Sequence, residues 1–165
     1  MPAQRSSDND KRRLRDPPPL EAWLQGLANA ASFAGYSKHK MAPQAFGLAP
    51  FSGEREDPTY CDAHANFTPA DMVRVGPLLR RGILAGLVGA NEFQGDPTLL
   101  WTVDDNGWIY EMRLTTPGRA LYHGYPVLSS EAIARKVIER YVHWVYDHRQ
   151  LELIPSVQRV LERYP

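Results

Sequence analysis

The sequence has a single cysteine, no long apolar run and no excess of charge of either sign. Cys61 alone cannot form an internal disulfide, which excludes a disulfide-stapled fold and fits a reducing compartment. No apolar stretch approaches the roughly 20 residues that a transmembrane helix needs, so no membrane partner is expected. The first residues, MPAQRSSDNDKRRLRD, lack the apolar segment of a secretory signal peptide. These absences predict a cytoplasmic protein.

The charges balance over the whole chain but are unevenly distributed. The 165 residues include 19 Lys and Arg against 19 Asp and Glu. Residues 1–40 hold seven basic and four acidic residues, whereas residues 41–165 hold 12 basic and 15 acidic ones. A protein that coats nucleic acid through its phosphates usually has a strong basic excess. The balance therefore argues against such a role and leaves room for a small, focused phosphate site.

Residues 1–19 contain charges, Ser, Asn and a run of prolines, with almost nothing apolar to bury. This composition predicts a disordered basic tail that ends in a stiff proline segment. Its basic residues are either solvated or contact a nucleic acid, a membrane surface or an acidic partner. Residues 20–165 are predicted to form a single domain.

The periodicity of the remaining chain predicts an α+β fold. Apolar residues recur at helical spacing over 20–34, 69–75, 77–88 and 130–148, and a short helix follows Pro155. Asn106-Gly107 lies between two β-rich runs, which is typical of a two-residue hairpin turn. We expect a small twisted antiparallel sheet, made of a hairpin over 99–114 and a strand over 119–125, flanked by helices.

A two-residue turn at Asn106-Gly107 would also set the strand register. It pairs Thr102 with Glu111 and places one apolar face against the core, made of Trp101, Val103, Trp108, Tyr110 and Met112. The opposite face then presents Thr102, Asp104, Glu111 and Arg113. The returning strand is expected to place Tyr122 beside Glu111 and His123 beside Tyr110. A sheet face with ionisable residues at its centre is either solvent-exposed or a site.

A second candidate feature is Lys38-His39-Lys40, directly after the first predicted helix. Two ammonium groups beside an imidazole lower its pKa and create an anion site, for which phosphate is the obvious ligand. The simpler interpretation is a polar flank whose cations complement the helix dipole.

If this segment folds over the polar sheet face, the two features form one site for metal-independent RNA cleavage. Such cleavage needs a base for the 2′-hydroxyl, an acid for the leaving oxygen and a cation for the phosphorane. The predicted catalytic residues are His39, Glu111 and His123, with Glu111 or His39 as the base and His123 or the other histidine as the acid. The predicted phosphate ligands are Lys38, Lys40 and Arg113, and the predicted substrate contacts are Thr102, Tyr122 and Tyr125. The alternative is an ordinary solvated face with a cross-strand Glu–Arg pair.

The stretch SKHKMAPQAFGL resembles the Lys-His followed by Phe-Gly pattern of several bacterial polymorphic-toxin ribonuclease domains. These belong to the barnase, colicin and RelE-like group, in which helices precede a small antiparallel sheet. The order of the predicted elements is similar here. The resemblance implies catalytic roles for His39 and Lys40.

Cys61, Asp62 and His64 could supply metal ligands, but a zinc site needs three or four, so a distant histidine would have to join. We therefore expect neither a metal nor another cofactor. The leading hypothesis is a metal-independent ribonuclease of bacterial toxin type, with RNA as substrate. The alternative is a non-enzymatic interaction module, such as an immunity-like protein, that binds a protein partner or inhibitor through the sheet face.

Overall fold

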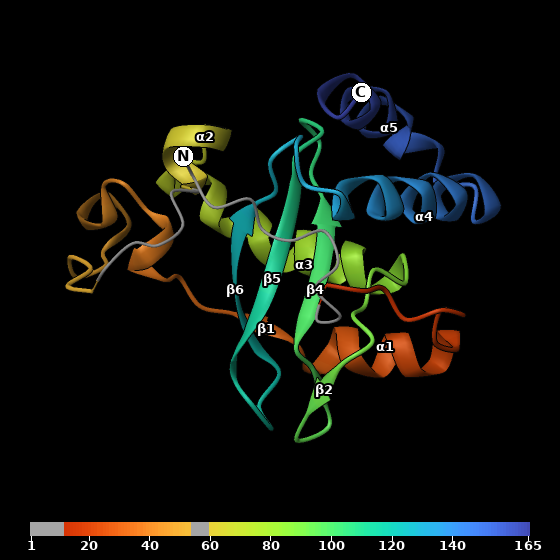
Figure 1. Ribbon diagram of the computed structural model, residues 1–165, viewed down its shortest axis with the longest axis horizontal. Coiled ribbons are helices and arrows are strands. Elements are labelled where there is room, and N and C mark those ends of the chain that lie inside the picture. The colour runs from red at the N-terminus through yellow and green to blue at the C-terminus, as the bar shows by residue number, and fades with distance from the viewer. Residues whose placement is uncertain (1–11, 54–59) are drawn as a thin grey trace.

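The computed structural model describes residues 12–53 and 60–165 of the chain (Figure 1). Its α-helices are α1 (Glu21–Ala30), α2 (Cys61–Ala65), α3 (Val75–Leu84), α4 (Ile133–Asp147) and α5 (Ile154–Arg163). Short 3₁₀ segments are η1 (Ser37–His39), η2 (Pro43–Phe46), η3 (Pro69–Arg74) and η4 (Leu151–Leu153). Within the described residues, no helix combines the length and the apolar character needed to cross a membrane.

The sheets confirm the α+β class. The main sheet has the strand order β1 (Ser32–Phe33), β6 (Leu121–Pro126), β5 (Ile109–Thr116) and β4 (Leu99–Val103). β4, β5 and β6 are antiparallel as expected, but β1 pairs parallel with β6, so the sheet is mixed. A separate small hairpin joins β2 (Glu92–Phe93) and β3 (Asp96–Pro97).

The predicted hairpin exists, but its predicted register is wrong by one residue. Trp101 pairs with Glu111 and Thr102 with Tyr110. Gly107 has a positive φ of 80° whereas Asn106 does not, which excludes the type I′ turn. The loop instead has three residues, closed by the Asp104 amide donating to the Trp108 carbonyl (2.9 Å). The Asp104 carboxylate accepts from the amides of Asn106 (2.9 Å) and Trp108 (2.8 Å) and stabilises this longer loop.

A shift of one residue exchanges the two faces of a strand. Trp101 and Glu111 therefore share one face, and Thr102, Tyr110 and Met112 share the other. The register of the third strand also differs from the prediction, because Glu111 pairs with Tyr125 and Arg113 with His123.

Both faces of the sheet are covered by helices, so the sheet separates two apolar cores. One core joins Trp101, Val103 and Ile109 to α4 and α5, which lie on the right of Figure 1. The other joins Leu100, Met112 and Tyr122 to α1 and α3, and α3 crosses behind the strands in Figure 1. All five residues of β4 are buried. The solvated sheet face, one of the two interpretations of the sequence, is therefore absent at β4.

The helix predictions are confirmed in position, with shifted ends. The first helix ends at Ala30, and the longest spans Ile133–Asp147 rather than 130–148. Thr68 and Asp71 form the capping box of η3. The two predicted pieces over 69–75 and 77–88 correspond to η3, which ends at Arg74, and α3, which begins at Val75 and has Pro77 in its first turn, where a proline is tolerated.

The N-terminal segment differs most from expectation. Leu14 is buried in the α4 side of the core, at 7% exposure. The Arg15 amide donates to the Val88 carbonyl (2.8 Å), and the Ala90 amide donates to the Arg13 carbonyl (2.8 Å). Residues 12–15 thus extend the sheet beyond β4 through residues 88–90, instead of belonging to a disordered tail. The part of the predicted tail over 1–11 lies outside the described residues.

Candidate functional site

The segment after β1 follows the outer edge of β6 and carries the predicted Lys-His-Lys motif. The Ala34 amide donates to the Tyr122 carbonyl (2.9 Å), which continues the pairing of β1 with β6. The His39 amide then donates to the Tyr36 carbonyl (3.2 Å) and closes the turn of η1. This turn places His39 against β6 on the side of Tyr125.

Four rings meet where η1 contacts β6, and we call them the imidazole cluster: Tyr36, His39, His123 and Tyr125. The rings of His39 and His123 stack with centroids 5.4 Å apart and planes at 17°. The His39 centroid lies 4.5 Å from that of Tyr125. Tyr36 lies edge-on to His123 at 4.8 Å and is 40% exposed. The two predicted catalytic histidines are therefore neighbours, although they are 84 positions apart in the sequence.

Glu111 is connected to the cluster through Tyr125. The Tyr125 hydroxyl donates to Oε1 of Glu111, while Trp101 Nε1 donates to Oε2 (3.1 Å). Arg12 Nε also donates to Oε2 (2.8 Å). The Glu111 side chain has no exposed surface and both its oxygens accept hydrogen bonds. Glu111 is thus placed to orient Tyr125 and is shielded from direct contact with a substrate.

Cations lie at the exposed rim of the cluster. Arg113 is 56% exposed at its side chain and lies 3.9 Å from the Glu111 carboxylate. Burial, together with the positive charges of Arg113, Lys38 and Lys40, lowers the pKa of His123 to about 4. The hydroxyl of Thr115 lies 2.7 Å from His123 Nδ1 and fixes the ring. His123 is therefore neutral at pH 7 and keeps an unprotonated ring nitrogen, which can accept a proton but is only weakly basic.

The lowered pKa of His123 predicts a stability loss in acid. Because the unfolded imidazole titrates near pH 6.5 and the folded one near 4, the unfolded state binds the extra proton as pH falls. The free energy of unfolding should thus drop by about 2–3 kcal/mol more in the wild type than in His123→Gln between pH 7.5 and 4.5. Urea unfolding at both pH values measures this difference. His148→Gln, at an exposed position, is the control and should follow the wild type.

Two of the predicted substrate contacts lie on the opposite face of the sheet. The Thr102 hydroxyl donates to the Leu78 carbonyl (2.6 Å) and Tyr122 donates to the Pro97 carbonyl (2.7 Å). Both side chains are buried in the α3 side of the core. The prediction that Thr102 and Tyr122 lie beside Glu111 is wrong, because the predicted pairing of the strands differs from the observed one. Tyr125, the third predicted contact, does lie in the cluster.

Lys40 is separated from His39 by the edge of β6. Its ammonium lies 5.2 Å from the ring centroids of both Phe46 and Phe67, and its side chain hydrogen-bonds the thiol of Cys61. Lys40 is 1% exposed, so its predicted role as a phosphate ligand requires access that this packing does not provide. Burial raises the pKa of Cys61, whose thiol also donates to the Gly124 carbonyl (3.3 Å).

The candidate metal ligands Cys61, Asp62 and His64 do not converge on a common point. Asp62 accepts from the amides of Met41 and Ala42 (both 2.8 Å), and His64 Nδ1 accepts from the Tyr60 amide (2.9 Å). Across residues 12–53 and 60–165, no group of three His, Cys, Asp or Glu side chains is arranged to hold a metal ion.

Sequence reasoning missed Arg12, Trp101 and Tyr36 as parts of the site. Arg12 was assigned to a disordered tail because its neighbours are polar. Trp101 is missed because the predicted register places Glu111 on the opposite face of the sheet, whereas the two side chains are hydrogen-bonded neighbours. Tyr36 precedes the Lys-His-Lys motif directly and could have been included on its position alone.

No protein-family model matches the chain, and no curated protein or solved structure is significantly similar to it.

Proposed function

We propose that the protein is a metal-independent endoribonuclease of the kind found in bacterial toxins, acting on RNA in the cytoplasm. The observation that supports this proposal is the stacking of His39 on His123 beside an exposed cation, Arg113. Two imidazoles and a cation are the set that acid–base cleavage of RNA requires.

His123 is the base in this mechanism. With the Nδ1 proton directed to Thr115, Nε2 accepts the proton of the 2′-hydroxyl, which then attacks the adjacent phosphorus. His39 donates a proton to the leaving 5′-oxygen, so that a 2′,3′-cyclic phosphate and a 5′-hydroxyl form. Arg113 and Lys38 stabilise the charge of the phosphorane.

Glu111 and Tyr125 act as positioning residues. Their hydrogen bond holds the phenol ring that packs against His39. The substrate reaches the imidazoles past Tyr36, whose ring covers His123 from the solvent side.

The test is incubation of the purified protein with a labelled single-stranded RNA in EDTA. We expect cleavage that leaves cyclic phosphate ends, and none of a DNA of the same sequence, which lacks the 2′-hydroxyl. His123→Ala and His39→Ala should each slow cleavage at least about 100-fold, while circular dichroism shows that they remain folded. His148→Ala is the matched control and should retain full activity.

Cleavage that is equally fast in the wild type and in both cluster variants would come from a contaminant and would overturn the proposal. RNA that stays intact after incubation with the wild type would also overturn the proposal. Expression in bacteria gives a second readout, since the wild type should arrest growth and His39→Ala should not.

A non-enzymatic interaction module is the alternative. The interaction module predicted from the sequence would bind its partner through an open face of the sheet, whereas all residues of β4 are buried. A harmless wild type that leaves RNA intact is the result that this alternative predicts.

A further inference from the structure

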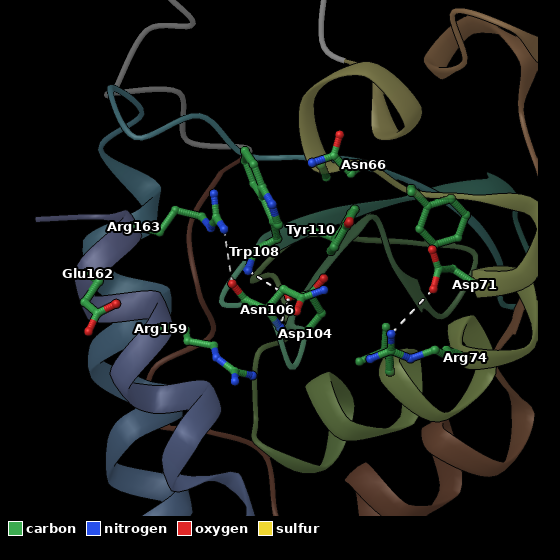
Figure 2. A pocket seen from close by; sticks show the side chains of 13 residues that line it. Asn66, Asp71, Arg74, Asp104, Asn106, Trp108, Tyr110, Arg159, Glu162 and Arg163 are labelled. Atoms are coloured by element: carbon green, nitrogen blue, oxygen red, sulfur yellow. Dashed lines mark hydrogen bonds and ion pairs between the residues drawn. The ribbon is translucent and has the colours of Figure 1, made fainter.

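A cleft of about 600 Å³ opens at the tip of the β4–β5 hairpin (Figure 2). Its walls come from four regions of the chain: the end of α2 with the following residues, η3 with the start of α3, the hairpin loop and its flanks, and the outer face of α5. No member of the imidazole cluster lines it. Its volume lies within the range of about 300–1,000 Å³ that is usual for small-molecule sites.

Two arginines of α5, Arg159 and Arg163, supply guanidinium groups to the cleft. Arg159 donates to the Asp105 carbonyl (2.7 Å) and Arg163 to the Asn106 carbonyl (3.3 Å). Neither guanidinium forms an ion pair with any residue that the structure describes. Arg74, on the opposite wall, differs because it pairs with Asp71 (3.5 Å) and Asp105 (2.9 Å). Arg159 and Arg163 thus retain donors for an anionic group such as a phosphate.

The cleft also contains an aromatic platform. Trp108 is half-buried, and the guanidinium of Arg163 lies 4.2 Å from the centre of its ring. Figure 2 shows the indole standing between Arg163 on one side and Tyr110 and Asn66 on the other. Phe67 adds a second ring to the wall. An aromatic surface beside guanidinium groups favours the stacking of a planar base.

Polar groups suited to the edge of a base surround this platform. The side-chain amides of Asn66 and Asn106 line the cleft, and each provides both a donor and an acceptor. Within the described residues, neither amide side chain makes a hydrogen bond. The hydroxyl of Tyr110 likewise has no partner there, although the residue is only 7% exposed.

Three acidic residues, Asp71, Asp104 and Glu162, also line the cleft, and in the described part of the chain none of them forms an ion pair with Arg159 or Arg163. Asp104 accepts from the amides of the hairpin loop, and Asp71 accepts from the amide and hydroxyl of Thr68 (both 2.9 Å). Glu162 is exposed on α5. The cleft thus holds three carboxylates beside three arginines, and we base its recognition on the donors of Arg159 and Arg163 together with the indole and the amides.

We propose that this cleft binds a nucleotide. The base stacks on Trp108, the amides of Asn66 and Asn106 contact its edge, and the phosphate is held by Arg159 and Arg163. The nucleotide is either a free mononucleotide or one residue of a single strand, which present the same groups to the cleft. The inference does not depend on the proposed ribonuclease activity, because it concerns binding away from the imidazole cluster.

Calorimetric titration of the full-length protein tests the proposal. The probes are the four nucleoside 5′-monophosphates, inorganic phosphate and a single-stranded deoxyoligonucleotide, which lacks the 2′-hydroxyl and so resists the proposed cleavage. We expect at least one nucleotide probe to bind more tightly than phosphate. Mononucleotide binding indicates a free ligand, and binding of the oligonucleotide alone indicates one residue of a strand.

Three substitutions locate the binding. Trp108→Leu should weaken binding about tenfold, and Trp108→Phe should restore most of it, because a base can stack on either aromatic ring but not on leucine. Arg163→Gln should weaken binding similarly and reduce its salt dependence. Arg80→Gln is the matched control, since this exposed arginine bonds Asn29 on α1, and it should bind as the wild type does.

The exposed position of Arg163 makes its variant informative even if Trp108→Leu fails to fold. Absence of binding by every nucleotide probe at millimolar concentration would overturn the proposal. Binding that matches phosphate in strength, or that Arg163→Gln leaves unchanged, would overturn it as well. None of these outcomes depends on whether RNA is cleaved.

Discussion

Replacement of Arg12 by methionine is expected to lower the free energy of unfolding by about 3–5 kcal/mol. The Arg12 side chain is 7% exposed and lies 2.7 Å from Glu111 and 3.2 Å from Glu131. Its removal leaves the carboxylate of Glu111 buried with no cation as close. Breaking one side of a buried ion pair costs more than the pair contributes, because the remaining charge is desolvated without compensation.

Urea unfolding of Arg12→Met, Glu111→Gln and the double variant measures this effect. The double variant should lose less free energy of unfolding than the two single variants lose together, because the side chains of Arg12 and Glu111 form an ion pair with each other. Arg13→Met is the matched control, because the neighbouring residue is exposed and forms no ion pair within the described chain. Equal stability of Arg12→Met and Arg13→Met would show that the segment before Leu14 is not held against the sheet.

Substitution of Gly82 by alanine is expected to destabilise the protein by about 3 kcal/mol or more. Gly82 lies where α3 crosses β4, and a Cβ there would come 2.0 Å from the Trp101 carbonyl oxygen and 2.8 Å from Thr102 Cβ. The first contact is with backbone, so a change of side-chain rotamer cannot relieve it. The helix would have to move away from the strand.

Gly76 in the same helix provides the control. A Cβ at Gly76 would meet nothing within 4 Å, so Gly76→Ala should be neutral or stabilise by about 0.5 kcal/mol, because alanine loses less backbone entropy. Thermal unfolding of both variants separates helix propensity from close packing. A Gly82→Ala variant as stable as Gly76→Ala would mean that α3 does not approach β4 this closely.

The existence of the elements could be predicted from the sequence, whereas the strand register could not. Periodicity located α1, α3 and α4, and Asn106-Gly107 located the hairpin. The register depends on the length of the hairpin loop, which Asn106-Gly107 alone does not determine. The carboxylate of Asp104 accepts from two loop amides and closes a loop of three residues rather than two. Because of that extra residue, each side chain of β5 lies on the opposite face, relative to β4, from the face predicted.

The candidate site was predicted in part for a related reason. His39 and His123 were predicted together because the motif follows the first helix and the third strand returns beside the hairpin. Lys40 directly follows the 3₁₀ turn η1, and its ammonium lies 5.2 Å from the ring centroids of both Phe46 and Phe67. Arg12 could not have been found by composition, since a charged residue pairs with a buried carboxylate only when the fold brings both together.

The extension of the sheet by residues 13–15 has a consequence for self-association. β4 would otherwise end the sheet, and residues 88–90 and then 13–15 cover its backbone through the Leu14–Gly89 and Val88–Leu100 bridges. An uncovered edge strand offers unpaired amides and carbonyls on which another copy can add a strand. The basic segment before α1 therefore covers the backbone on which another copy could add a strand, which protects the protein from aggregation. The ion pairs of Arg12 with Glu111 and Glu131 hold this segment against the interior.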